Sequence, residues 1–191
     1  PIPPTATPSP TPNPSTPTPM AGAYVVGDVR IYADSYETLG GGQIRATGNI
    51  QINDYVAVEG SSAYLILHTE GTPWVEGQGL VKMKDLNLPV FLGDFEFEPV
   101  AGNPDFGVLV PGDYTSQLIE LAGYFIHEQP INLVINVVQG WLYVETLIEI
   151  NVEAIGLNIA RVDCVMDWAG NFTGNVHGFS FTLAGVVISF D

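Results

Sequence analysis

Oxygen donors gather in one short segment of the sequence, Asp167-Trp-Ala-Gly-Asn171-Phe-Thr-Gly-Asn175. Carboxylate and amide oxygens are the ligands that Ca²⁺ takes in proteins. The spacing is not that of an EF-hand loop, and Asp, Asn and Gly are also the common residues of tight turns. We therefore name Asp167, Asn171 and Asn175 as candidate calcium ligands, and we expect no other cofactor.

Tryptophan is the second residue type here with binding chemistry, because an indole ring can stack on a sugar ring. Trp74 and Trp168 lie beside turn-forming residues, which predicts that both are exposed. They are the candidates for a platform that binds polysaccharide. The alternative is that they fill the core or a subunit contact, as aromatic residues more often do.

Acidic residues are abundant, and Glu145, Glu149 and Glu153 recur at every fourth position. In a strand they would share one face, which either faces water or lines a cleft for a cation or a sugar. The three histidines do not have the spacing of a metal site on a helix, and no serine or cysteine lies in a nucleophile motif. We predict no catalytic residue and a protein that is not an enzyme.

The charge balance limits the partners. The chain has 5 basic and 21 acidic residues, a formal net charge of −16. Nucleic acids and anionic membrane surfaces attract basic patches, so we expect neither as a partner. Beyond the N-terminal segment, the uncharged runs 129–144 and 178–190 are too short or too polar to insert into a membrane. Cys164 is the only cysteine, which excludes an intrachain disulfide and predicts a buried thiol, with an intermolecular bridge as the alternative.

Apolar and polar residues alternate with period two along most of the chain, for example over 28–33, 43–48 and 94–98. This period places successive side chains on opposite faces of a sheet. Gly-Asp or Gly-Asn precedes several of these runs and suits a hairpin turn. The pattern predicts an all-β fold, mainly an antiparallel meander or sandwich of many short strands. One short helix or irregular strand is expected near 116–126.

The N-terminal segment has a different composition, because residues 1–19 hold most of the 15 prolines of the chain. Proline fixes φ and removes the backbone donor, which favours an extended polyproline II conformation. Thr and Ser interleaved with Pro are typical of secreted linkers, so we expect an extracellular or cell-surface protein. We predict an extended linker or arm over 1–22 and a β-rich domain over 23–191. The prolines expected to contact a neighbouring subunit are Pro4, Pro8, Pro10, Pro12 and Pro17.

The run 178–190 is uncharged and largely apolar. It is either a core strand or a strand that pairs with a neighbouring molecule by β-addition. Lys82 and Lys84 are the only lysines, although β proteins commonly guard exposed edge strands with lysine. The residues of this run that we expect in a subunit contact are Phe179, Phe181, Leu183, Ile188 and Phe190.

The layout of a Pro/Thr-rich linker followed by a β-rich domain resembles that of bacterial β-rich extracellular filament and surface proteins. The resemblance implies a structural subunit of a homopolymeric, pilus-like filament or surface fibre, assembled through β contacts and the N-terminal arm. The layout is also similar to that of carbohydrate-binding modules in secreted bacterial glycoside hydrolases. This second resemblance implies the alternative function, a secreted carbohydrate-binding or adhesive module.

Overall fold

The described residues of the chain form a 16-stranded antiparallel sheet in the computed structural model. The structure describes residues 22–102, 104–117, 120–121, 124–126, 130, 132–152, 156–183 and 186–190. The prediction of an all-β, antiparallel fold is confirmed. The predicted arm and its five named prolines lie outside the described residues, and the domain boundary at residue 22 stays a prediction.

The strands follow one another through hairpins along most of the chain. The first nine are β1 (Tyr24–Val26), β2 (Val29–Tyr32), β3 (Ser35–Gly40), β4 (Gln43–Thr47), β5 (Ile50–Ile52), β6 (Val56–His68), β7 (Trp74–Met83), β8 (Leu88–Phe97) and β9 (Val108–Ser116). The others are β10 (Glu120–Leu121), β11 (Tyr124–Ile126), β12 (Asn132–Asn136), β13 (Trp141–Val152), β14 (Gly156–Asp167), β15 (Phe172–Leu183) and β16 (Val186–Phe190).

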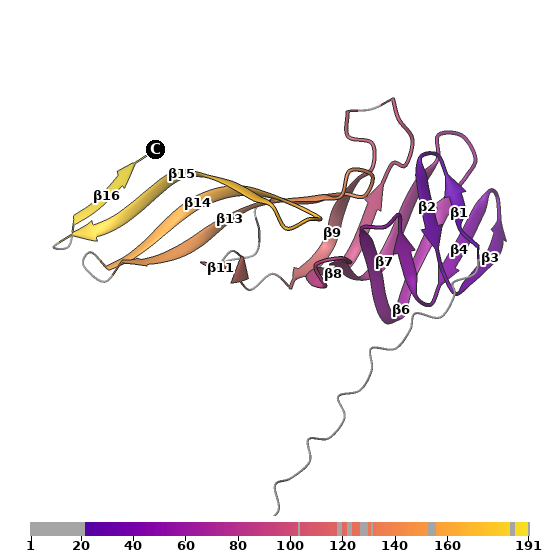
Figure 1. Ribbon diagram of the computed structural model, residues 1–191, viewed down its shortest axis with the longest axis horizontal. Coiled ribbons are helices and arrows are strands. Elements are labelled where there is room, and N and C mark those ends of the chain that lie inside the picture. Colours follow the sequence, from indigo (N-terminus) through magenta and orange to yellow (C-terminus); the bar gives the residue numbers. More distant parts are fainter. Residues whose placement is uncertain are drawn as a thin grey trace, which may run out of the picture.

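The molecule is elongated, with a rounded part built from β1–β9 and a long ribbon of strands that extends from it (Figure 1). We call β1–β9 the body and β13–β16 the extension. The main path of the sheet runs β1-β2-β5-β6-β7-β8-β9-β12-β13-β14-β15-β16. The body therefore continues into the extension through the pairing of β9 with β12 and of β12 with β13.

β6 divides the sheet of the body into two branches. Its first part, Val56–Glu59, pairs with β5, its second part, Tyr64–His68, pairs with β4, and both parts pair with β7. A β-bulge separates the two parts. The bulge changes which positions face the core, because Val58 is buried before it and Leu65 is buried after it.

The two branches fold back on each other. The rings of Tyr24 in β1 and Tyr36 in β3 have centroids 5.8 Å apart, and the Tyr36 hydroxyl donates to the Ile31 carbonyl at 2.6 Å. The β1–β2 turn also touches the end of β8, where the Asp28 N–H donates to the Pro99 carbonyl at 2.9 Å. These contacts curl the sheet around an apolar interior.

The alternation read from the sequence produces one continuous core. On β7 every second residue is buried, namely Val75, Gly77, Gly79, Val81 and Met83, and the residues that alternate with them are more exposed. The same cluster reaches from the body into the first part of the extension, where Leu142 and Val144 are buried. Each fully buried aliphatic side chain stabilises the fold by about 1.5–3 kcal/mol.

Turns at the base of the extension are attached to turns of the body. The Asn53 side-chain amide donates to the Val137 carbonyl at 2.7 Å. The rings of Tyr55 and Trp168 have centroids 5.8 Å apart, and the backbone N–H of Trp168 donates to the Gly140 carbonyl at 2.8 Å. These contacts fix the start of the extension on the body.

The segment near 116–126 differs from one of its two predicted forms. Its described residues form β10 and β11, which pair with each other, and β11 also pairs with β13 through Phe125 and Glu149. The irregular-strand alternative is therefore confirmed for these residues, and the helix is wrong there. The spacing of Leu121 and Phe125 is helical, but pairing with a neighbouring strand overrides so weak a local preference.

Candidate functional site

The outer face of β7, β8 and β9 carries two adjoining hollows. The first has a volume of about 350 Å³ and the second about 330 Å³, and both are lined by Glu96 and Val110. The first is lined by Trp74, Glu96, Phe97, Glu98, Asp105, Val108 and Val110. The second is lined by Tyr64, Glu76, Gly77, Asp94, Phe95, Glu96, Val110, Pro111 and Gly112. We call the two hollows together the outer groove.

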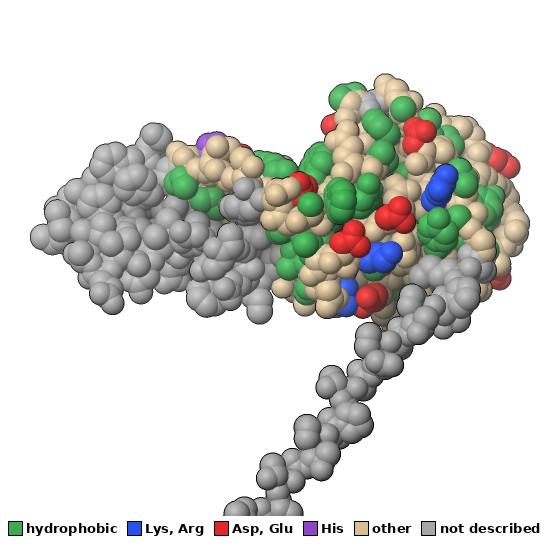
Figure 2. Space-filling view, in the orientation of Figure 1, with side chains coloured by type: hydrophobic (Ala, Val, Ile, Leu, Met, Phe, Trp, Pro, Cys, Tyr) green, Lys and Arg blue, Asp and Glu red, His purple; other side chains and the backbone are tan. Residues whose placement is uncertain are grey.

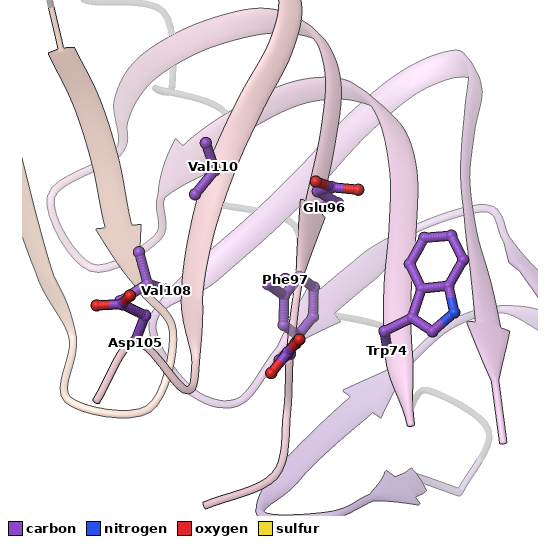
Figure 3. A pocket seen from close by; sticks show the side chains of 7 residues that line it. Trp74, Glu96, Phe97, Asp105, Val108 and Val110 are labelled. Atoms are coloured by element: carbon purple, nitrogen blue, oxygen red, sulfur yellow. The ribbon is translucent and has the colours of Figure 1, made fainter. Parts of the chain in front are cut away.

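Strand register explains why these residues share one face. Glu76 on β7 lies between Ile66 on the neighbouring β6 and Glu96 on the neighbouring β8. Glu96 in turn lies opposite Val110 on β9. Figure 3 shows Trp74, Glu96 and Val110 on neighbouring strands around the first hollow. The groove is thus a shallow trough across three strands.

Trp74 is held in place by the side chain of His68. The two rings are stacked, with centroids 3.8 Å apart and an angle of 8° between their planes. His68 Nε2 lies 2.9 Å from Glu76 Oε1, and the Gln43 side-chain amide lies 3.3 Å from His68 Nδ1. A neutral imidazole with its proton on Nε2 satisfies both contacts. The indole is therefore oriented by a network from three strands, and His68 covers one of its faces.

The groove combines an aromatic surface with acidic hydrogen-bond acceptors. Carboxylates of Glu76, Asp94, Glu96, Glu98 and Asp105 contribute to its lining, and no Lys or Arg is among the described residues that line it. At the far end Tyr64 has the Arg45 guanidinium 5.0 Å from its ring centroid. Carboxylates accept hydrogen bonds from hydroxyl groups, and an aromatic face contacts the C–H face of a sugar ring. This chemistry suits a polyhydroxylated ligand.

The space-filling view shows the same mixture over the visible face of the body. Acidic and apolar side chains are interspersed there, and basic side chains are few (Figure 2). The ion pairs among described residues include Lys82 with Glu59 at 2.6 Å.

The two predicted platform residues have different surroundings. Trp74 lines the outer groove, as the carbohydrate hypothesis requires. Trp168 is 45% exposed but packs on Tyr55 at the base of the extension, and it does not line either hollow. The structure therefore does not bring the two tryptophans into one site.

The candidate calcium ligands are also divided between two places. The carboxylate of Asp167 accepts from the Asn171 backbone N–H at 2.8 Å and from its side-chain amide at 2.7 Å, which closes the β14–β15 turn. These bonds lower the pKa of Asp167, the side-chain bond being the larger cause. Asn175 lies farther along β15 and donates to Asp163 at 3.4 Å. In the part of the chain that the structure describes, no group of three or more His, Cys, Asp or Glu is placed to hold a metal ion.

A polar cluster surrounds Asp163 on the extension. His177 contacts this carboxylate through Nε2, and the neighbouring Arg161 pairs with Glu145. Partial burial acts to raise the pKa of Asp163, but the hydrogen bonds from Asn175 and His177 outweigh it and the pKa is lowered. Glu145 is thus part of an ion pair, and it does not stand in an unpaired acidic row.

The residues predicted for a subunit contact belong to β15 and β16, which form a hairpin with Phe179 opposite Phe190. β16 is the last strand of the sheet path, and no described strand pairs with its other side. β15 pairs with β16 only from Phe179 to Leu183, so the outer side of Phe172–Val176 also has no partner strand among the described residues. The run is therefore paired within the chain on one side and open on the other.

Sequence reasoning missed most of the outer groove. Asp94, Glu96 and Glu98 alternate with Phe95 and Phe97, and this pattern does place the three acids on one outer face. The missing information is register, because nothing in the sequence places Trp74 and Val108 on the strands beside them.

Comparisons with protein-family models, with curated proteins and with solved structures found no match to this chain. A search of the described residues for a helix of sufficient length and hydropathy to cross a bilayer found none.

Proposed function

We propose that the chain is a structural subunit of an extracellular homopolymer, a filament or surface fibre, and that its role involves no catalysis. One observation carries the proposal: an open sheet edge and the attachment point of the N-terminal arm lie at opposite ends of an elongated molecule. The described chain begins at residue 22, just before β1 in the body, and β16 lies at the far end of the extension (Figure 1). Contacts between unlike surfaces at opposite ends propagate and form open fibres unless the rotation closes a ring.

The composition of the open edge supports the proposal. β16 has the sequence Val-Val-Ile-Ser-Phe, with no charge and no proline. An edge strand with unpaired N–H and C=O groups accepts another strand, and proteins that remain monomeric commonly block such an edge with lysine, proline or a bulge. The overall charge of −16, the few lysines and the Pro/Thr-rich arm favour an extracellular setting.

Electron microscopy of the purified full chain over a range of concentrations tests this function. We expect unbranched fibres one molecule thick. Ser189→Lys places a charge on β16 and should abolish them, whereas Thr72→Lys, at an exposed position of the body, should not. Circular dichroism establishes that both variants keep the fold. Separate particles of the parent protein at every concentration would contradict the proposal.

The outer groove favours a second candidate function, binding of a polysaccharide. The supporting observation is Trp74, which is oriented by its stack with His68 and lines a hollow rich in carboxylates. Affinity electrophoresis in gels containing different polysaccharides tests it. Trp74→Ala should remove the retardation, and Trp168→Phe, outside the groove, should leave it unchanged. Equal retardation of the parent and Trp74→Ala would exclude this site.

A further inference from the structure

The outer side of β15 offers a vacant position for one more strand. β16 occupies that side from Phe179 to Leu183, and no described strand occupies it from Phe172 to Val176. A β-bulge at His177 separates the two stretches, because Arg161 is opposite Gly178 and Val162 is opposite Val176. We call Phe172–Val176 the vacant edge.

The exposure of this stretch agrees with its lack of a neighbour. Thr173, Gly174, Asn175 and Val176 are all exposed, so the strand is accessible from both faces. Val176, an aliphatic side chain, is 60% exposed. The vacant edge therefore presents unpaired backbone groups together with apolar surface, the two requirements for β-addition.

The N-terminal arm contains a segment whose proline pattern fits one side of such an edge. From Pro8 to Pro14 the sequence is Pro-Ser-Pro-Thr-Pro-Asn-Pro, so prolines alternate with Ser9, Thr11 and Asn13. In an extended strand, alternate residues direct their N–H and C=O groups to the same side. All three available N–H groups of this segment would therefore point to one side, and the prolines would take the other side.

This arrangement is the one in which proline is compatible with a sheet, namely an edge strand whose proline positions face solvent. Residues that precede proline also favour extended backbone, which suits Ser9, Thr11 and Asn13. The side with the prolines carries no N–H group, so it cannot continue the ladder. An arm bound in this way would complete the sheet and at the same time close its edge.

We propose that Ser9–Asn13 of one copy adds as an edge strand to Phe172–Val176 of a second copy. The two segments have the same length, five residues, or about 17 Å of extended chain. Residues 14–21 then form a spacer of up to about 25 Å between the bound strand and the body of the donor copy. The inference rests on the proposed function, and it adds a second contact between successive subunits, which reinforces the one at the open edge of β16.

Disulfide trapping between two full-length variants tests the contact directly. One variant carries Thr11→Cys and the other carries Gly174→Cys, because pairing Ser9–Asn13 with Phe172–Val176 places Thr11 opposite Gly174. The two variants are mixed under mild oxidation. Residues facing each other across antiparallel strands have Cα atoms about 4.5–5.5 Å apart, which a disulfide can bridge. The native Cys164 does not compete, because it is 3% exposed.

We expect the cross-linked dimer of Thr11→Cys with Gly174→Cys to form at least tenfold faster than two matched controls. The controls are Thr16→Cys with Gly174→Cys, and Thr11→Cys with Thr72→Cys. Rates equal to those of the controls would overturn the proposal. Cross-linking only inside a chain that carries both cysteines would also overturn it, because the arm would then bind its own copy.

Hydrogen exchange on the full chain tests whether the N–H groups of Ser9, Thr11 and Asn13 bond to the vacant edge. Amides of Phe172–Val176 should exchange at least tenfold more slowly at high protein concentration than at low concentration. Thr11→Pro removes one of the N–H groups that face the vacant edge and should abolish this protection. Thr16→Pro lies in the spacer and should keep the protection. Protection that survives Thr11→Pro would contradict the strand geometry. Fibres that form without any protection of Phe172–Val176 would refute this contact and leave the proposed function intact.

Discussion

Gly140 shows how single residues join the extension to the body. Its backbone has φ of +71°, and a Cβ built at this position would lie 2.6 Å from Trp168 Cδ1 and 2.8 Å from Tyr55 Cδ1. Only glycine provides both the left-handed conformation and the space for the two rings. Trp168 is therefore a packing residue at the junction between the body and the extension. This role is nearer to the alternative given for the tryptophans, that they fill packing contacts, than to an exposed binding platform.

Gly140→Ala should lower the free energy of unfolding by about 2–4 kcal/mol, because it combines a left-handed alanine with an overpacked contact. Gly41→Ala is the matched control. Gly41 also has positive φ, but a Cβ there meets nothing within 4 Å, so we expect a loss of only about 1–2 kcal/mol. Urea denaturation measures both. Equal losses for the two variants would show that the contact with Tyr55 and Trp168 contributes nothing.

Cys164 makes the stability of the protein depend on pH in the alkaline range. Burial raises the pKa of its thiol from 9.0 to about 11. As the pH rises, the thiol of the unfolded chain loses its proton before the buried thiol of the folded chain does. Below about pH 9 the thiol keeps its proton in both states, so the contribution of Cys164 to the free energy of unfolding is constant. Between pH 9 and about 11 the contribution decreases.

We therefore expect urea denaturation of the parent protein to show a loss of stability above pH 9 that is smaller in Cys164→Ala. The remaining loss in the variant reports other groups, including Tyr36 and Tyr114, whose pKa values burial also raises. Parallel curves for parent and variant across this pH range would contradict the assignment.

At the scale of single elements, hairpin turns depend on side chains that bond to the backbone. Asn136 ends β12 and is only 4% exposed. Its Oδ1 atom accepts from the backbone N–H groups of Val138 and Gln139 at 3.0 and 2.7 Å. The side chain thus satisfies two donors of the tight turn that leads into β13.

Asn136→Ala should destabilise the protein by about 2–4 kcal/mol, because two partly buried N–H groups lose their acceptor. Asn132→Ala, at the exposed start of β12, should change stability by less than about 0.5 kcal/mol. Thermal or urea unfolding measures the difference. A loss below about 1 kcal/mol in Asn136→Ala would mean that water replaces the side chain at this turn.

Period-two alternation was enough to predict the strands, because a strand with one buried face must alternate whatever its partners are. It was not enough for β6, whose bulge between Glu59 and Tyr64 reverses the inward positions and creates the two branches. The bulge depends on which strands pair on either side, and this information is not local. The same limit explains why Trp74 was predicted as a binding residue while the acids that surround it were not.

The two ends of the whole molecule differ, and the proposed assembly depends on this asymmetry. The body has a curled sheet over a continuous core, whereas the extension ends in a strand with one open side among the described residues. The arm joins the molecule at the body. The open edge of β16 and the arm are unlike surfaces, and contacts made by unlike surfaces explain why assembly would proceed head to tail and would not stop at a dimer.

Sedimentation velocity of the full chain over a hundredfold range of concentration is the most direct test of this central claim. We predict a broad distribution of species that shifts to larger sedimentation coefficients as the concentration rises, and a single slow species for Ser189→Lys throughout. A single monomeric boundary for the parent protein at every concentration, or a shift that stops at a dimer, would contradict the account.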